Sequence, residues 1–160
     1  MSLLRSHGVE VVNVSRLFKT VPIGGGRQPP YVNAAVVVTS EHSPRELLRI
    51  CKQIEREAGR TLGRRWGPRV LDLDIIDYAG RCVPGRQVPA PTALQYAGLI
   101  LPHPRAHARS FVLIPVAEIA PAWRHPRLGA TAEQLLRRRP LSERRAIIPM
   151  RPWPLAPTAG

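Results

Sequence analysis

Apolar residues recur with a period of two in two stretches near the start of the chain, and this pattern predicts two β-strands. Residues 9–19 are rich in β-branched and aromatic side chains, and residues 31–39 alternate between two faces, one of them formed by Tyr31, Asn33, Ala35 and Val37. We interpret residues 20–30, between the strands, as a mobile loop, because no Lys-Ser/Thr pair follows the glycine run 24–26. Leu3 and Leu4 indicate the end of a helix before the first strand.

A helical period follows in residues 44–58. Ser43 is a suitable N-cap, Pro44 fits the first helical position, and Glu46 completes a capping box. Gly59 is expected to end the helix, and Glu55 is expected on a solvated flank beside the buried stripe. The stripe itself consists of Leu47, Cys51, Ile54 and Ala58.

Shorter elements complete the chain. Helices are predicted over residues 105–120 and 131–138, and a short strand over residues 146–148, so the fold class is α+β. Residues 78–100 form a long connection, and loops of that length are commonly functional or poorly ordered. We assign residues 1–148 to a single domain and expect the proline-rich residues 149–160 to form a disordered tail.

The segment 70–76 carries the most informative polar pattern. Its β-branched residues favour a strand, on which Asp72 and Asp74 face one side while the neighbouring leucines enter the core. Two such carboxylates lie roughly 7 Å apart at Cβ, a separation that suits a shared site for a hard cation such as Mg²⁺. Just before them, Trp66 offers a stacking surface and Arg69 a planar fork for phosphate. Together these residues predict a site for a nucleotide with magnesium.

Charge and cysteine content narrow the classes of partner. The chain has 24 lysines and arginines against 11 acidic residues, a net charge of +13. Such a surplus attracts phosphate on a nucleotide or along a nucleic acid, and it also arises from arginine-rich composition without any partner. No apolar run has the length of a membrane span, and Cys51 and Cys82 give no disulfide framework. We therefore expect a cytoplasmic protein without a membrane partner.

The segment 65–76, Arg-Trp-Gly-Pro-Arg-Val-Leu-Asp-Leu-Asp-Ile-Ile, resembles the signature of the hydroxymethyldihydropterin pyrophosphokinases of folate biosynthesis. Residues 101–121, which begin Leu-Pro-His-Pro-Arg, and residues 20–22 with 31–35 resemble the same family. The resemblance implies a ferredoxin-like α/β sandwich with a central, mostly antiparallel sheet. It also implies that the chain transfers pyrophosphate from ATP to 6-hydroxymethyl-7,8-dihydropterin and releases AMP.

The same resemblance implies roles for individual residues. Asp72 and Asp74 would bind two Mg²⁺ ions and would form the catalytic set together with Arg69. The residues implied to bind ATP are Arg60, Arg64, Arg65, Trp66, Arg69, His103 and Arg109. Those implied to bind the pterin are Thr20, Tyr31, Asn33, Trp66 and Phe111. No side chain is implied as a general base.

The start of the chain departs from the family pattern. Family members begin with a strand and a Gly-Ser-Asn-type turn before a long helix, whereas only the end of that helix is found here. We therefore expect the N-terminal strand to be missing. Either the start site was placed too late, or the chain is a fragment or a degenerate paralogue, and the sequence does not decide among these three explanations.

We expect a monomer whose partners are ATP and a reduced pterin. The alternatives are a paralogue that binds ATP with little or no activity, and a basic protein associated with nucleic acid. Paired acids favour the enzyme over the nucleic-acid protein, because carboxylates contribute nothing to binding a phosphate backbone.

Overall fold

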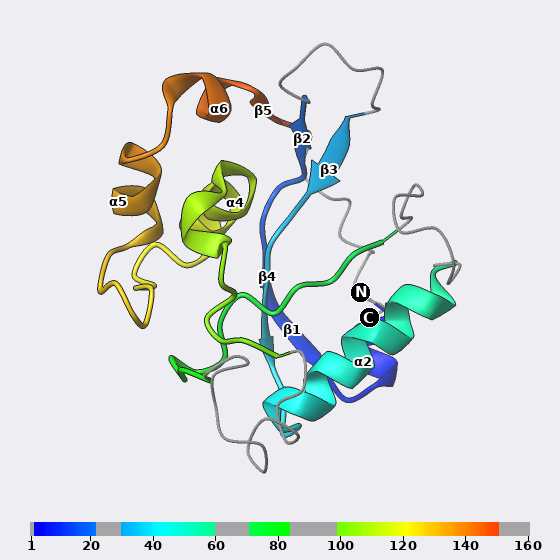
Figure 1. The fold of residues 1–160 in the computed structure, drawn as a ribbon. Helices are drawn as coiled ribbons and strands as arrows, with labels where there is room; N and C mark the ends of the chain where they lie inside the picture. The colour runs from blue at the N-terminus through cyan, green and yellow to red at the C-terminus, as the bar shows by residue number, and fades with distance from the viewer. Residues whose placement is uncertain (1, 22–29, 60–70, 84–98, 151–160) are drawn as a thin grey trace. The chain divides into compact units, whose positions relative to one another are not determined.

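The computed structural model describes residues 2–21, 30–59, 71–83 and 99–150 (Figure 1). The chain divides into two compact units, Met1–Val11 with Thr39–Pro104, and Val12–Val38 with Arg105–Gly160. Helices and antiparallel strands occur together, which confirms the predicted α+β class. Among the helices that are described, none is both long and apolar enough to cross a membrane.

The first unit contains helices α1 (Ser2–Ser6) and α2 (Pro44–Glu57). Gly8 follows α1 with a φ of +70°, a conformation that glycine adopts without strain, and its N–H donates to the Arg5 carbonyl. His42, just before α2, donates from Nε2 to the His7 carbonyl at 2.8 Å. This bond ties the turn after α1 to the start of α2.

The predicted signals for α2 are confirmed. The Ser43 hydroxyl accepts a hydrogen bond from the Glu46 N–H, and the Glu46 carboxylate accepts one from the Ser43 N–H, so the capping box is complete. The hydrogen bonds from the Ser43 side chain and backbone lower the pKa of Glu46. Gly59 ends the helix with a φ of +94°. The predicted stripe is buried at Leu47, Cys51 and Ile54.

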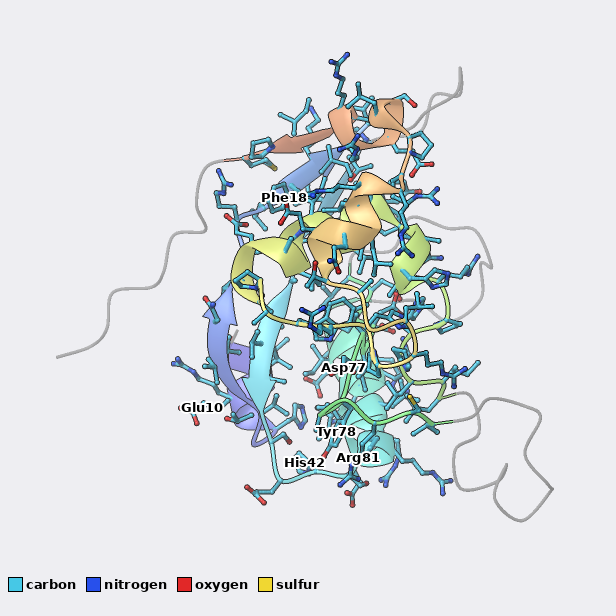
Figure 2. All side chains as sticks on the ribbon, turned by 90° about the vertical axis from the view of Figure 1, so that its left-hand side faces the viewer. Glu10, Phe18, His42, Asp77, Tyr78 and Arg81 are labelled. Atoms are coloured by element: carbon cyan, nitrogen blue, oxygen red, sulfur yellow. The ribbon has the colours of Figure 1, made fainter. Side chains whose placement is uncertain are left out.

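Two further described segments of the first unit, residues 71–83 and 99–104, contain no helix. Val83 and Leu101 exchange backbone hydrogen bonds and are buried together with Leu99, so the two ends of the predicted long connection meet. The Tyr78 hydroxyl donates to the His42 carbonyl at 2.6 Å, and the Arg81 guanidinium lies 5.5 Å from the Tyr78 ring centroid (Figure 2).

Each of the two predicted strands is interrupted once. The first forms β1 (Glu10–Val14) and β2 (Phe18–Thr20), and the second forms β3 (Tyr31–Asn33) and β4 (Val36–Thr39). The interruptions face each other: the Ser15 N–H donates to the Ala35 carbonyl, and the Ala35 N–H donates to the Ser15 hydroxyl, both at 2.9 Å. A side-chain oxygen thus replaces one backbone acceptor and breaks the regular ladder.

The strands form two small sheets. β1 pairs with β4, while β2 lies between β3 and β5 (Ile147–Pro149) with antiparallel pairing on both sides. β5 begins and ends one residue later than the strand predicted over residues 146–148. Residues 151–160 of the predicted tail lie outside the described residues.

Helices of the second unit contact the sheet formed by β2, β3 and β5. The short 3-10 helix η1 (Ala106–Ala108) precedes α4 (Ser110–Ile119), so the predicted helix over residues 105–120 is formed in two parts. Helix α5 (Ala132–Arg137) starts from a capping box made by Thr131 and Gln134, and α6 (Leu141–Arg145) was not predicted. The core of this unit joins α4 and α5 through Leu113, Ala130, Ala132 and Leu135.

Candidate functional site

The acidic segment Leu71–Asp77 is not a strand, which corrects the strand predicted over residues 70–76; Val70 lies outside the described residues. A strand needs a neighbour in register, and here backbone groups of the segment bond to other partners. The Leu73 N–H donates to the Glu55 carboxylate at 2.7 Å, and the Ile76 carbonyl accepts from the His103 N–H at 2.9 Å. The segment is therefore held by a helix side chain and by the chain around His103.

Exposure within the segment nevertheless alternates as predicted. Asp72 and Asp74 are exposed, with side-chain exposures of 39% and 44%, while Leu71, Leu73 and Ile75 are half-buried. Packing of Ile75 against the cluster of Val83, Leu99 and Leu101 fixes the inner side. The two carboxylates consequently remain accessible to a ligand from solvent.

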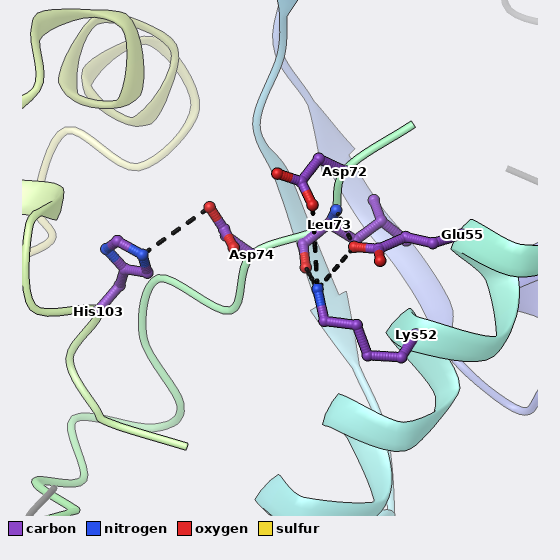
Figure 3. Close-up of polar contacts among 6 residues, drawn as sticks. All are labelled: Lys52, Glu55, Asp72, Leu73, Asp74 and His103. Atoms are coloured by element: carbon purple, nitrogen blue, oxygen red, sulfur yellow. Dashed lines mark hydrogen bonds and ion pairs between the residues drawn. The ribbon is translucent and has the colours of Figure 1, made fainter. Parts of the chain in front are cut away.

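Glu55 was predicted on a solvated flank, and this prediction is wrong. Its side chain is fully buried, and one carboxylate oxygen accepts hydrogen bonds from the Leu73 N–H and from the Lys52 ammonium, both at 2.7 Å (Figure 3). Burial of a carboxylate is costly unless it is paired with charge and hydrogen bonds, and both are supplied here. Glu55 thereby fastens α2 to the acidic segment.

Lys52 connects the same groups from the solvent side. Its ammonium lies 2.7 Å from the Glu55 carboxylate, 3.5 Å from the Leu73 carbonyl and 4.0 Å from the Asp72 carboxylate (Figure 3). Lys52 and Glu55 were not among the residues predicted for the site. Their spacing of three residues beside the apolar stripe is an ion-pair signal, although spacing alone does not tell which side of the helix is covered.

His103 approaches the other acid. Its Nε2 lies 3.8 Å from Asp74 Oδ2, and its side chain is 19% exposed (Figure 3). The backbone bond to Ile76 sets the position of His103 beside the segment. The structure thus brings together three of the residues predicted for the site, Asp72, Asp74 and His103.

The remaining predicted residues fall into two groups. The first group lies in the second unit and consists of Thr20, Tyr31, Asn33, Arg109 and Phe111. There, Asn33 donates from Nδ2 to the Thr20 hydroxyl at 2.8 Å, Tyr31 is 59% exposed opposite Thr20, and the Arg109 guanidinium lies 5.5 Å from the Phe111 ring centroid. Five predicted residues lie outside the described residues: Arg60, Arg64, Arg65, Trp66 and Arg69.

The donor set is suited to magnesium. Asp72 and Asp74 offer accessible carboxylate oxygens, whereas the described residues contain no group of three or more histidine, cysteine or acidic side chains that could hold a metal ion. Mg²⁺ is commonly bound by one or two carboxylates and completes its shell with water and substrate phosphates. The acid pair therefore has the chemistry of a site for magnesium with a phosphate-bearing ligand.

The exposed acid pair on an α+β fold defines a candidate site for magnesium with a phosphate-bearing ligand, and comparison with known proteins gives the family. The chain belongs to the 7,8-dihydro-6-hydroxymethylpterin-pyrophosphokinase (HPPK) family, whose sequence profile matches residues 1–121. This confirms the resemblance drawn from the three motifs.

Individual relatives support the same family assignment. The chain is similar to the 2-amino-4-hydroxy-6-hydroxymethyldihydropteridine pyrophosphokinases of three bacteria. It is 41% identical to that of Synechocystis sp. over 81% of this chain and 60% of the relative. It is 40% identical to that of Methylorubrum extorquens, over 74% of this chain and 68% of the relative. It is 41% identical to that of Bacillus subtilis, over 74% of this chain and 65% of the relative. The chain thus spans between 60% and 68% of the length of these relatives.

Proposed function

We propose that this chain is an ATP-dependent pyrophosphokinase that converts 6-hydroxymethyl-7,8-dihydropterin to its diphosphate and releases AMP. The observation that supports this most directly is the pair of exposed carboxylates, Asp72 and Asp74, which are presented together in a chain of the HPPK family. In this reaction the pterin hydroxymethyl oxygen forms a bond to the β-phosphorus of ATP. The bond from that phosphorus to the oxygen bridging to the α-phosphate breaks, AMP leaves with that oxygen and the electron pair of the bond, and the hydroxymethyl proton passes to solvent.

Reactions of this type depend on alignment and charge neutralisation more than on covalent help from the protein. Asp72 and Asp74 would hold the metal, for which we propose two Mg²⁺ ions. Magnesium, when bound, neutralises the triphosphate and polarises its oxygens. The part of this chain is to present both carboxylates outward at fixed positions, which the hydrogen bond from Leu73 to Glu55 supports.

His103 and the basic residues would bind ATP. His103 lies beside Asp74 with its ring at the edge of the acid pair, a position from which it can reach a phosphate oxygen near the metal. Arg109 and the arginines of residues 60–69 complete the proposed ATP-binding set, and Arg69 would act with the acid pair in catalysis. Guanidinium groups suit this task because their planar fork matches phosphate oxygens.

The proposed pterin-binding residues are Thr20, Tyr31, Asn33, Trp66 and Phe111. A pterin is a flat heterocycle with an amide-like edge, so it needs ring faces for stacking and an oriented amide for its edge. The bond from Asn33 to Thr20 fixes the Asn33 side chain, and the exposed Tyr31 ring lies opposite Thr20 in the strand register. These features support the assignment of β2 and β3 to pterin recognition.

The acid pair gives the sharpest test. Asp72→Ala and Asp74→Ala should each lower the rate of pterin-dependent AMP formation by roughly a hundred- to a thousandfold, the range found when one group that supports charge stabilisation in the transition state is removed. Because both side chains are exposed, melting temperatures should remain close to that of the parent chain. Asp77→Asn is the matched control, since the Asp77 carboxylate accepts from the Gly80 N–H in a turn of the same segment. Near-normal turnover of both alanine variants with saturating magnesium would overturn the site assignment.

We propose that the chain has a ferredoxin-like arrangement, is a monomer, and works in the cytoplasm. The free thiols of Cys51 and Cys82 support a reducing compartment. Sedimentation of the purified chain tests the oligomeric state. Titration with duplex DNA at physiological salt tests the nucleic-acid alternative, which tight binding of DNA without affinity for ATP would favour.

A further inference from the structure

Lys52 is the described cation that approaches the acid pair from helix α2. Its ammonium reaches the Glu55 carboxylate, the Leu73 carbonyl and the Asp72 carboxylate at 2.7, 3.5 and 4.0 Å. It therefore touches both the carboxylate that fastens the acidic segment and one of the two carboxylates that the segment presents.

We propose that Lys52 is a positioning residue that holds Asp72 in the metal-free protein and sets the affinity for the divalent cation. This inference rests on the proposed function, in which Asp72 binds magnesium. The Lys52 ammonium supplies a single positive charge beside Asp72 before a metal arrives. A divalent cation then binds the same carboxylate within the field of Lys52, and repulsion between the two cations weakens metal binding.

Glu55 determines how strongly Lys52 acts. A fully buried carboxylate at 2.7 Å draws the ammonium toward α2 and partly neutralises it, so the charge felt at Asp72 is less than that of an isolated lysine. The side chains of Lys52 and Asp72 are 38% and 39% exposed, which means that solvent screens their mutual attraction. The Lys52–Asp72 contact is therefore weak enough for a metal to replace.

Two substitutions should then shift metal affinity in opposite directions. Lys52→Gln keeps a donor for Glu55 but removes the charge, so the cation concentration at half-saturation should fall roughly three- to tenfold, as expected for one charge acting over about 4–6 Å near solvent. Glu55→Gln keeps an acceptor for the Leu73 N–H but leaves the Lys52 charge without its partner. The half-saturation concentration should therefore rise roughly threefold or more.

The experiment measures Mn²⁺ binding by the loss of the free-ion signal in electron paramagnetic resonance. Each titration uses the full chain with α,β-methylene-ATP, an analogue in which the bond that breaks in the proposed reaction is replaced. Lys52→Arg retains the charge and should bind Mn²⁺ like the parent. Arg56→Gln is the matched control, because it removes an exposed positive charge from the same helix. It should leave the half-saturation concentration unchanged.

The outcomes separate this inference from the proposed reaction. If Lys52 only supported the fold, Lys52→Gln and Glu55→Gln would both weaken Mn²⁺ binding, and that result would overturn the inference. Unchanged binding by Lys52→Gln would also overturn it, as would a parent chain that fails to bind Mn²⁺. If Lys52→Gln fails to fold, Glu55→Gln and Lys52→Arg still decide: equal affinities of these two variants would reject the proposal. Opposite shifts without AMP formation by the parent would instead refute the pyrophosphokinase activity and leave the role of Lys52 intact.

Discussion

Removal of the Glu55 side chain should destabilise the protein substantially, even though glutamate is an ordinary residue for a helix surface. In Glu55→Ala the Leu73 N–H loses a charged acceptor at 2.7 Å, which typically costs about 1.5–3 kcal/mol. Lys52 also loses its partner, but at 38% exposure it regains water, so its share is at most about 1 kcal/mol. The cavity left by a fully buried side chain adds about 1 kcal/mol. We expect a total of about 3 kcal/mol.

Urea denaturation followed by circular dichroism at 222 nm measures this loss. With a slope of about 2 kcal/mol per molar urea, a change of about 3 kcal/mol lowers the midpoint by about 1.5 M. Glu55→Gln should fall between the parent and Glu55→Ala, because its amide oxygen still accepts from Leu73. The matched control is Glu57→Ala on the same helix, where the glutamate side chain is 38% exposed and pairs with His7 at 3.6 Å. That variant should change stability by less than about 1 kcal/mol.

The result that would refute this reasoning is specific. A free energy of unfolding for Glu55→Ala within about 0.5 kcal/mol of the parent would place its cost in the range of ordinary surface substitutions. It would show that the bond from Leu73 to Glu55 contributes nothing net, and the acidic segment would then have to be held by other contacts. A loss as large in Glu57→Ala would also count against the argument, because it would assign the effect to helix α2 as a whole.

Three further predictions follow from the core, the helix cap and the thiols. Leu101→Ala should lower the free energy of unfolding by about 2–5 kcal/mol in urea melts, because Leu101 is fully buried; a loss below about 1 kcal/mol would contradict its place in the core. Glu46→Ala should lower the melting temperature above pH 4.5, the usual pKa of this group, because the pKa of Glu46 is lower in the folded state. The difference in melting temperature from the parent should disappear as the pH falls through that lowered pKa. A difference that persists in acid would exclude the charged form of the cap as its cause. Burial raises the pKa of the Cys51 thiol, whereas Cys82 is exposed, so a thiol reagent at pH 8 should modify one cysteine in the native chain and two after unfolding.

Local signals in the sequence predicted helix α2 well, because the groups that start it are close together in the chain. The capping box spans Ser43 to Glu46, and the buried stripe repeats every three to four residues. The strands were predicted less completely. β-Branched residues indicated extended chain over residues 9–19 and 31–39, but the interruption at Ser15 depends on a hydroxyl that reaches Ala35, 20 residues away. Helix α6 is only five residues long and has no side-chain cap, so no local sequence pattern predicted it.

The candidate site shows the same division between local and distant causes. Alternation along residues 71–75 correctly indicated that Asp72 and Asp74 are exposed and their leucine neighbours half-buried. The sequence could not show that Glu55 is buried, because its partner Leu73 lies 18 residues further along the chain. Nor could β-propensity show that residues 71–77 lack strand pairing, since pairing depends on the position of another backbone. The charge that faces Asp72 from Lys52 was missed for the same reason.

The bond between Leu73 and Glu55 explains how two acids can be presented together without a sheet. In extended chain, the residues before and after a given residue both direct their side chains to the opposite side. Leu73 lies between Asp72 and Asp74, and its backbone N–H is held by a buried carboxylate while its side chain is half-buried. Fixing this one residue therefore turns both neighbouring carboxylates outward. In a paired strand the ladder of backbone bonds would do this; here the Glu55 carboxylate on α2 holds Leu73, and substitutions at Glu55 should consequently disturb both acids at once.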